Sequence, residues 1–228
     1  MTDHPGFSSL GRSAAFRAFL VAVLGLCAAG CPDPEQQVSS RDPGDRIRAI
    51  REMADRGSEA DVQRLAEAAA HEDAGTAVEA VAALARTDRM TAVAALSRVA
   101  TKDRRPQVRQ MAVSSLTQHK QPEAVQALRE VVATDENRDV QGEAAVALGR
   151  VGTLDDVALL LGIVQADEDP VVVSRAVAGI ERLVSVRFGY DPAAPADERA
   201  LARRRVLAEA PALVARIRQE LAKKGETR

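Results

Sequence analysis

The stretch VRQMAVSSL at residues 108–116 places Val108, Ala112 and Leu116 four residues apart, a spacing that puts all three on one face of a helix. The pair of a small alanine and a large aliphatic residue four positions later occurs five times along the chain. The alanines are Ala49, Ala80, Ala112, Ala144 and Ala176, and their partners are Met53, Leu84, Leu116, Leu148 and Ile180. Consecutive alanines are 31, 32, 32 and 32 residues apart, so the chain contains an internal repeat of this length.

A second apolar face follows the first in four of these units. Its valines are Val62, Val93, Val125 and Val157, and its leucines are Leu65, Leu96, Leu128 and Leu160. Residues suited to helix starts precede or open this face: the capping pairs Ser58–Asp61 and Thr153–Asp156, and Pro122. Each unit is therefore predicted to be a helix–turn–helix. Because one such unit cannot bury its apolar faces alone, the units are expected to stack as a solenoid.

This pattern resembles HEAT repeats of the short bacterial variety, similar to the repeats of phycobilin lyases. The alanine positions, the step of 31–32 residues and the PxVR sequence at Pro106–Arg109 carry the resemblance. It implies an all-α fold, a right-handed α–α superhelix of about five helical hairpins over residues 45–184. Armadillo repeats need a third helix, for which the repeat has no room. Tetratricopeptide repeats have a period of about 34 residues and aromatic positions that are missing here.

The repeat fails after residue 184. The next second helix should carry a valine at 189 and a leucine at 192, but Gly189 and Pro192 stand there, and proline forbids a continuous helix. Gly189 also permits a backbone turn that is closed to other residues. Residues 185–228 are therefore expected to form an insertion loop and C-terminal capping helices, with Pro211 opening or kinking the last one.

Four side chains are candidate partner-binding residues. Leu159 and Leu161 lie at outward positions where the sister helices carry alanine, serine or arginine, so a partner or another segment must cover them. Phe188 and Tyr190 are the only aromatic residues after position 19. They fit a recognition hot spot, or a clasp in which Phe188 fills the core beside the two leucines and Tyr190 half-covers it. The clasp is the favoured interpretation.

The N-terminus resembles a bacterial lipoprotein signal. Two arginines precede the uncharged stretch AFLVAVLGLCAAG at residues 18–30, which is shorter than the about 20 residues of a spanning helix. LCAAGC at residues 26–31 resembles a lipobox, which implies a signal peptide at residues 1–30 and lipidation of Cys31. An uncleaved signal anchor and ordinary secretion are the alternatives. Residues 31–44 are expected to form the lipidated cysteine and a flexible tether.

The sequence shows no catalytic or metal-binding constellation. His4 lies in the signal, His71 and His119 are isolated and are interpreted as surface side chains, and Gly152 is interpreted as a left-handed helix cap. The 31 basic and 33 acidic residues are well mixed, which argues against a nucleic-acid binder. The chain is expected not to be an enzyme and to take no metal, cofactor, nucleic acid or small-molecule substrate.

Asp103, Asp135 and Asp167 recur every 32 residues in the turns between units. One interpretation is an acidic rail for a cation or a basic partner, although carboxylates about 10 Å apart cannot share one ion. The favoured interpretation is that each aspartate begins a turn and stabilises the N-terminus of the next helix.

These features together predict a lipid-anchored scaffold or adaptor that binds an unknown protein partner at the bacterial cell envelope. The outer membrane, with the protein facing the periplasm, is the favoured location. The alternative is a phycobilin-lyase-like protein that acts on a tetrapyrrole or as a chaperone-like lyase, which the export signal disfavours. A HEAT-type nucleic-acid binder is disfavoured by export, charge and the scarcity of aromatics.

The lipobox makes Cys31 the acceptor of the lipid, so Cys31→Ala is expected to abolish labelling of the chain by a fatty-acid probe in cells. Cys27→Ala is the matched control, because Leu26 precedes Cys27 where a lipobox has a small residue. Labelling that persists in Cys31→Ala would refute the lipid anchor.

Overall fold

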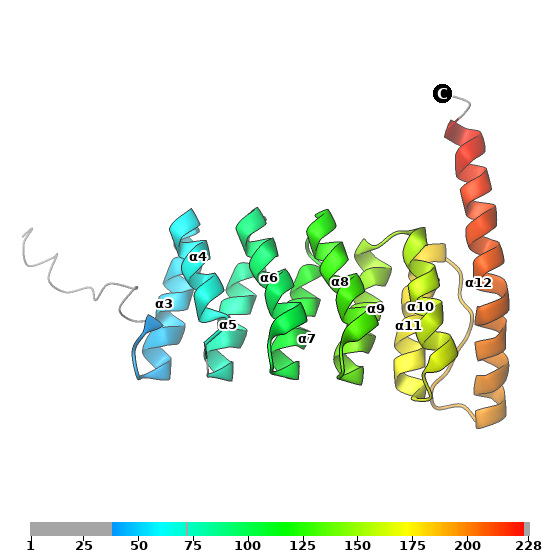
Figure 1. Cartoon of the computed structure of the whole chain (residues 1–228), viewed down its shortest axis with the longest axis horizontal. Coiled ribbons are helices and arrows are strands. Elements are labelled where there is room, and N and C mark those ends of the chain that lie inside the picture. The colour runs from blue at the N-terminus through cyan, green and yellow to red at the C-terminus, as the bar shows by residue number, and fades with distance from the viewer. Residues whose placement is uncertain (1–37, 72, 226–228) are drawn as a thin grey trace, which may run out of the picture.

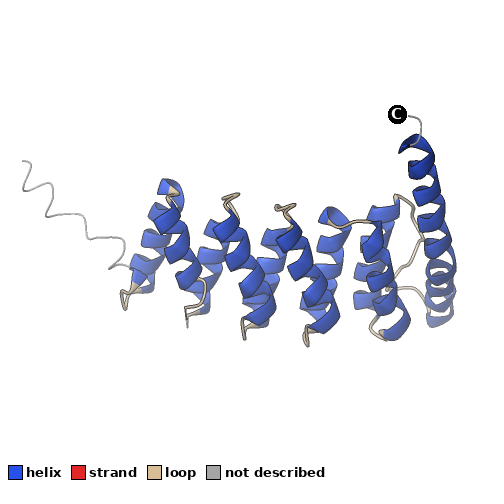
Figure 2. Cartoon of the chain, turned by 45° about the horizontal axis from the view of Figure 1, so that its top comes forward, coloured by secondary structure: helices blue, strands red, loops and turns tan. Residues whose placement is uncertain are grey.

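The structure is a computed structural model that describes residues 38–71 and 73–225; Cys31 and the predicted signal peptide lie outside these ranges. Within the described residues the chain forms ten α-helices and no strand (Figures 1 and 2). The helices are α3 (Pro43–Arg56), α4 (Glu59–Ala68), α5 (Ala74–Leu84), α6 (Met90–Lys102), α7 (Pro106–Leu116), α8 (Pro122–Thr134), α9 (Arg138–Val151), α10 (Val157–Ala166), α11 (Pro170–Val184) and α12 (Ala196–Gly225). A short 3-10 helix, η1 (Leu154–Asp156), precedes α10.

The helices form two layers that run from α3 at one end to α12 at the other (Figure 1). The first helices of the units (α3, α5, α7, α9 and α11) pack against one another in sequence order. The second helices (α4, α6, α8 and α10) form the other layer. This arrangement confirms the predicted all-α solenoid, and the array begins at Pro43, two residues before the expected boundary.

The core follows the columns seen in the sequence. All five column alanines and all five aliphatic partners are completely buried. The valines and leucines of the second helices are at most 7% exposed. Because each helix offers one such stripe to both neighbours, a single apolar core runs through the whole array.

The predicted helix starts are confirmed, and one predicted helix end is wrong. Ser58 with Asp61 and Thr153 with Asp156 form capping boxes, and Pro122 is the first residue of α8. Gly152 is extended (φ −78°, ψ −168°), not left-handed. A Cβ there would lie 2.6 Å from both Asp156 Oδ2 and the Leu148 carbonyl oxygen, so the glycine serves close packing around the capping box.

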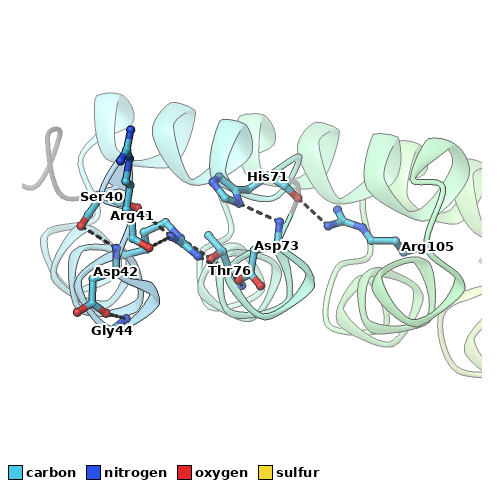
Figure 3. A network of polar contacts seen from close by, with 9 residues as sticks. Ser40, Arg41, Asp42, Gly44, His71, Asp73, Thr76 and Arg105 are labelled. Atoms are coloured by element: carbon cyan, nitrogen blue, oxygen red, sulfur yellow. Dashed lines mark hydrogen bonds and ion pairs between the residues drawn. The ribbon is translucent and has the colours of Figure 1, made fainter.

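One hydrogen bond recurs at the entry to every first helix. The N-terminal cap residue donates its backbone N–H to a side chain two residues earlier. The acceptors are Ser40 Oγ (3.1 Å), His71 Nδ1 (3.0 Å), Asp103 Oδ1 (2.8 Å), Asp135 Oδ1 (2.8 Å) and Asp167 Oδ1 (2.9 Å). Figure 3 shows the first two of these bonds. The aspartates therefore organise turns, and Ser40 and His71 do the same in the first two units.

Arginines connect these turns from one unit to the next. Arg46 donates to the Ser40 carbonyl (2.8 Å) and to Thr76 Oγ1 (2.9 Å). Arg105 donates to the His71 carbonyl at 2.6 Å (Figure 3). Arg109 reaches the Asp103 carbonyl (2.9 Å) and both carboxylate oxygens of Asp135 (2.7 Å each). These charge-assisted bonds fix the spacing of adjacent turns.

The first helices come closest where glycines replace larger residues. A Cβ added to Gly149 in α9 would lie 2.6 Å from the Cα of Gly179 in α11. A Cβ added to Gly179 would lie 2.5 Å from the Ala145 carbonyl oxygen. Since both neighbours are backbone atoms, only glycine permits this approach of α9 to α11.

The fifth unit departs from the repeat, as the sequence predicts. The chain leaves α11 through Ser185, turns at Gly189 (φ 75°) and enters α12. Helix α12 packs on α10 and α11 and buries Val206, Ala210 and Val214. It therefore takes the place of a fifth second helix and closes the end of the stack.

The expected C-terminal capping helices are one continuous helix, α12, with Pro211 inside it. Pro211 lies on the exposed face, where the carbonyl that lacks a helical N–H can turn to water. The last turns of α12 project beyond the other helices (Figure 1), and Leu221 is 58% exposed.

Gly179→Ala is expected to lower the free energy of unfolding by about 1–3 kcal/mol, because its new methyl group meets backbone that cannot move aside. The matched control is Gly162→Ala in α10, where an added Cβ meets nothing within 4 Å. That change should raise stability by up to about 1 kcal/mol, since alanine favours helix over glycine. Urea denaturation of both variants tests the pair; equal effects would contradict the close α9–α11 contact.

Candidate functional site

A groove opens between α8 and α10 on the layer of second helices. It encloses about 290 Å³. The residues lining it are Val132, Ala133, Arg138, Gln141, Leu159, Gly162, Ile163, Ala166 and Asp167. Helices α8 and α10 touch far less than α9 and α11 do, so the close packing of the first helices here is matched by an opening between the second helices. We call this hollow the α8–α10 groove.

Small residues stand at two repeat positions of the groove. Gly162 stands where α8 carries Glu130 and α6 carries Arg98. Ala166 stands where those helices carry Thr134 and Lys102. One unit earlier, a hollow of the same volume, about 290 Å³, lies between α6 and α8, but its lining is polar and includes Lys102, Thr134 and Asp135. The α8–α10 groove has instead the apolar side chains of Leu159 and Ile163 beside it.

The inner end of the groove is polar. Asp167 and Gln141 are each 7% exposed, whereas the Arg138 side chain is 62% exposed. The Gln141 amide donates to the Val132 carbonyl (2.8 Å), and its oxygen accepts from Arg138 Nη1 (2.8 Å). Arg138 Nη1 also lies 3.1 Å from Asp167 Oδ2. An apolar recess thus ends at a buried carboxylate.

The structure separates the two predicted leucines. Leu159 is partly buried and lines the α8–α10 groove. Leu161 is also partly buried against the core, but it is not among the groove residues. Both leucines have partial cover from this chain, and only Leu159 lies at an open hollow.

Phe188 and Tyr190 lie on the loop between α11 and α12. Phe188 is 2% exposed and belongs to the core, and its backbone N–H donates to Glu181 Oε1 at 2.6 Å. Tyr190 is partly buried, and burial raises the pKa of its phenol against the opposing effect of Arg199 and Arg203. This burial favours the clasp over a hot spot that includes Phe188.

A second, wider hollow of about 690 Å³ lies between this loop and the start of α12. Its lining includes Phe188, Asp191 and Glu198, and Leu201, which is 70% exposed, stands at its edge. The hollow carries both acidic and basic side chains, including Arg204 and Arg205. It has no buried polar atom without a partner, so it selects a ligand less sharply than the α8–α10 groove does.

The aspartate column is occupied by structural contacts. The side chains of Asp103, Asp135 and Asp167 are 8%, 4% and 6% exposed. Burial raises the pKa of Asp103, but hydrogen bonds from Arg105 outweigh it and hold that pKa below its usual value. Buried, arginine-paired carboxylates cannot form an open acidic rail, so the turn-forming interpretation fits their geometry.

The prediction that His119 is a surface residue is wrong. His119 is 1% exposed, and neither ring nitrogen has a hydrogen-bond partner. Its Nδ1 lies 3.8 Å from Asp88 Oδ1, and Asp88 belongs to the turn of the preceding unit. The residue pattern within one unit does not reveal this contact with the turn of the neighbouring unit. Burial lowers the pKa of His119, and Asp88 only partly offsets this.

The described residues contain no cluster of three or more His, Cys, Asp or Glu side chains placed to hold a metal ion. In the same part of the chain, every helix is too short or too polar to cross a bilayer.

The family model of HEAT repeats matches residues 93–181. The matched segment runs from α6 into α11 and includes the α8–α10 groove. Two solved structures of designed or engineered proteins are similar to the chain. An engineered protein has a TM-score of 0.47 at 18% identity over 79% of this chain and 96% of its own. A designed armadillo repeat protein has a TM-score of 0.45 at 17% identity over 78% and 98%. No curated protein matches the sequence.

His119 should make stability fall as the pH drops from about 7 to 5.5. The unfolded chain takes up a proton near the ordinary pKa of 6.5, whereas the folded chain does so only at lower pH. Protonation therefore favours unfolding in this window, by at most about 1.4 kcal/mol per pH unit.

Urea midpoints at pH 7.5 and 5.5 measure this effect. His119→Leu should remove most of the difference between the two midpoints. The control is His71→Asn, which keeps an acceptor for the Asp73 N–H. An unchanged pH dependence in His119→Leu would show that His119 does not carry it.

Proposed function

We propose that the chain is a lipid-anchored, non-enzymatic scaffold or adaptor that binds a protein partner at the bacterial cell envelope. The α8–α10 groove is the observation that carries the proposal. It is a recess on the layer of second helices with an apolar lining, in which Gly162 and Ala166 stand where α8 has the polar Glu130 and Thr134. Exposed apolar recesses with a few polar groups are typical of binding sites.

The ends of the array suit a tethered binding module. The described helices begin with α3, and helices α8 and α10, which border the groove, lie toward the other end of the array, near α12 (Figure 1). Packed layers are about 10 Å apart, so the groove lies roughly 30 Å along the stack from α3. Residues 32–44, if extended, add reach of roughly 40 Å. A lipid on Cys31 would then hold the groove well away from the membrane.

A pull-down of the tagged full chain from solubilised membranes tests the scaffold function. The supporting result is a protein that is enriched over a control lacking residues 45–225 and re-forms the complex when both partners are purified. Leu159→Glu in the groove should weaken that complex at least about tenfold. Met90→Glu is the matched control, because Met90 is also an apolar side chain on a second helix and is 56% exposed. No enrichment over the control, or equal effects of the two substitutions, would contradict the proposal.

A further inference from the structure

A buried carboxylate oxygen without a hydrogen bond marks the inner end of the α8–α10 groove. Asp167 Oδ1 accepts the Asp169 backbone N–H at 2.9 Å, but Oδ2 is buried and accepts no hydrogen bond. A charged oxygen that is removed from water is costly unless a donor satisfies it. The only compensation for this atom among the contacts of the described residues is its ion pair with the exposed Arg138 side chain, so it marks a place in the groove where a better donor can bind.

The preceding unit supplies its aspartate with a buried donor. Arg109 in α7 binds both oxygens of Asp135 at 2.7 Å, and its side chain is 12% exposed. Thirty-two residues later the same position is Gln141, whose amide turns to the Val132 carbonyl instead. The replacement of arginine by glutamine leaves Asp167 without the buried cation that Asp135 has.

Arg138 is the only cation beside Asp167 Oδ2 among the ion pairs of the described residues. Its Nη1 is 3.1 Å away and donates a hydrogen bond to Gln141 Oε1, whereas its contact with Asp167 Oδ2 is an ion pair without a hydrogen bond. The Arg138 side chain is 62% exposed, and exposed ion pairs are weak. Arg138 can therefore swing into solvent when a better donor enters the groove.

We infer that the α8–α10 groove receives a lysine side chain of the partner protein, with its ammonium group on Asp167 Oδ2. The inference rests on the proposed function, that the chain binds a protein. Val132, Leu159 and Ile163 would pack against the four-carbon stem, as apolar surfaces do with lysine stems. The volume of about 290 Å³ lies at the lower limit for drug-sized ligands and suits a single side chain.

Asp167 Oδ2, the one oxygen of this carboxylate without a hydrogen bond, suits the ammonium group of a lysine. Asp167 Oδ1 accepts the Asp169 N–H in the turn, as Asp135 Oδ1 accepts the Asn137 N–H. Arg109 binds Asp135 with two parallel hydrogen bonds, whereas a single hydrogen bond is missing at Asp167. A compact ammonium group on a flexible stem fits a single acceptor at the end of an apolar recess.

The test uses the peptide Ac-AAKAA-NH2 and the same peptide with norleucine in place of lysine, which keeps the aliphatic stem and removes the charge. Amide resonances of Gly162 and Ala166 are followed by NMR as each peptide is added to the protein. The lysine peptide should give saturable shifts and bind at least about tenfold more tightly than the norleucine peptide. Absent shifts, or equal affinity for the two peptides, would overturn the inference.

Three substitutions locate the site. Gly162→Gln fills the groove at a position where a Cβ meets nothing within 4 Å, and Gln141→Arg supplies Asp167 with the internal cation that Asp135 has. Each substitution should weaken binding of the lysine peptide at least about tenfold. Arg138→Ala removes the competing cation and should strengthen binding severalfold, whereas Arg104→Ala, an equal charge change in an exposed turn, should not. Insensitivity to Gly162→Gln and Gln141→Arg would place the peptide elsewhere and overturn the inference.

The failure of this inference can be distinguished from failure of the scaffold function. A partner recovered from membranes that binds equally well to Gly162→Gln and Gln141→Arg would support the scaffold function and contradict the lysine-binding groove. Lysine-peptide binding without any recovered partner would support the lysine-binding groove and contradict the scaffold function. Spermidine is added as a free-amine probe. Tighter binding of spermidine than of the peptide would indicate that the groove binds a free polyamine and would overturn the inference of a protein partner.

Discussion

Close contact between the first helices is the constraint on which the rest of the structure depends. Five completely buried alanines let these helices approach, and each is followed one turn later by a large side chain that fills the core between layers. At Gly149 and Gly179 the approach becomes a backbone contact. Drawing α9 and α11 together in one layer accompanies the opening between α8 and α10 in the other, so the packing of the core and the shape of the surface are linked.

The repeat and its core could be predicted from the sequence because both depend on spacing within one unit. The alanine column, the second-helix columns and the capping pairs all follow from local periodicity. What could not be predicted depends on contacts between units. His119 is buried by a turn of the preceding unit, and Gly152 is set by the Asp156 carboxylate. Helix α12 passes through Pro211 because that residue happens to face water.

The candidate site shows the same division. Leu159 was recognisable because an outward leucine departs from its sister positions, and Gly162 and Ala166 carry the same kind of signal. The role of Gln141 was hidden, because only the Arg109–Asp135 pair in three dimensions shows that this position can place a cation on the aspartate. Departures from a repeat thus point to function most clearly when the contact they remove is known. Here the α8–α10 groove has an apolar lining and ends at a carboxylate oxygen that accepts no hydrogen bond.

Photo-crosslinking in living cells tests the central claim most directly, that a protein partner binds on the layer of second helices at the α8–α10 groove. A photoreactive phenylalanine derivative is placed at Ala133, an exposed residue of the groove, and at Met111, which is 37% exposed on a first helix. The account predicts one defined crosslinked partner from Ala133 and none from Met111. The same partner from Met111, or no crosslink from Ala133, would contradict it.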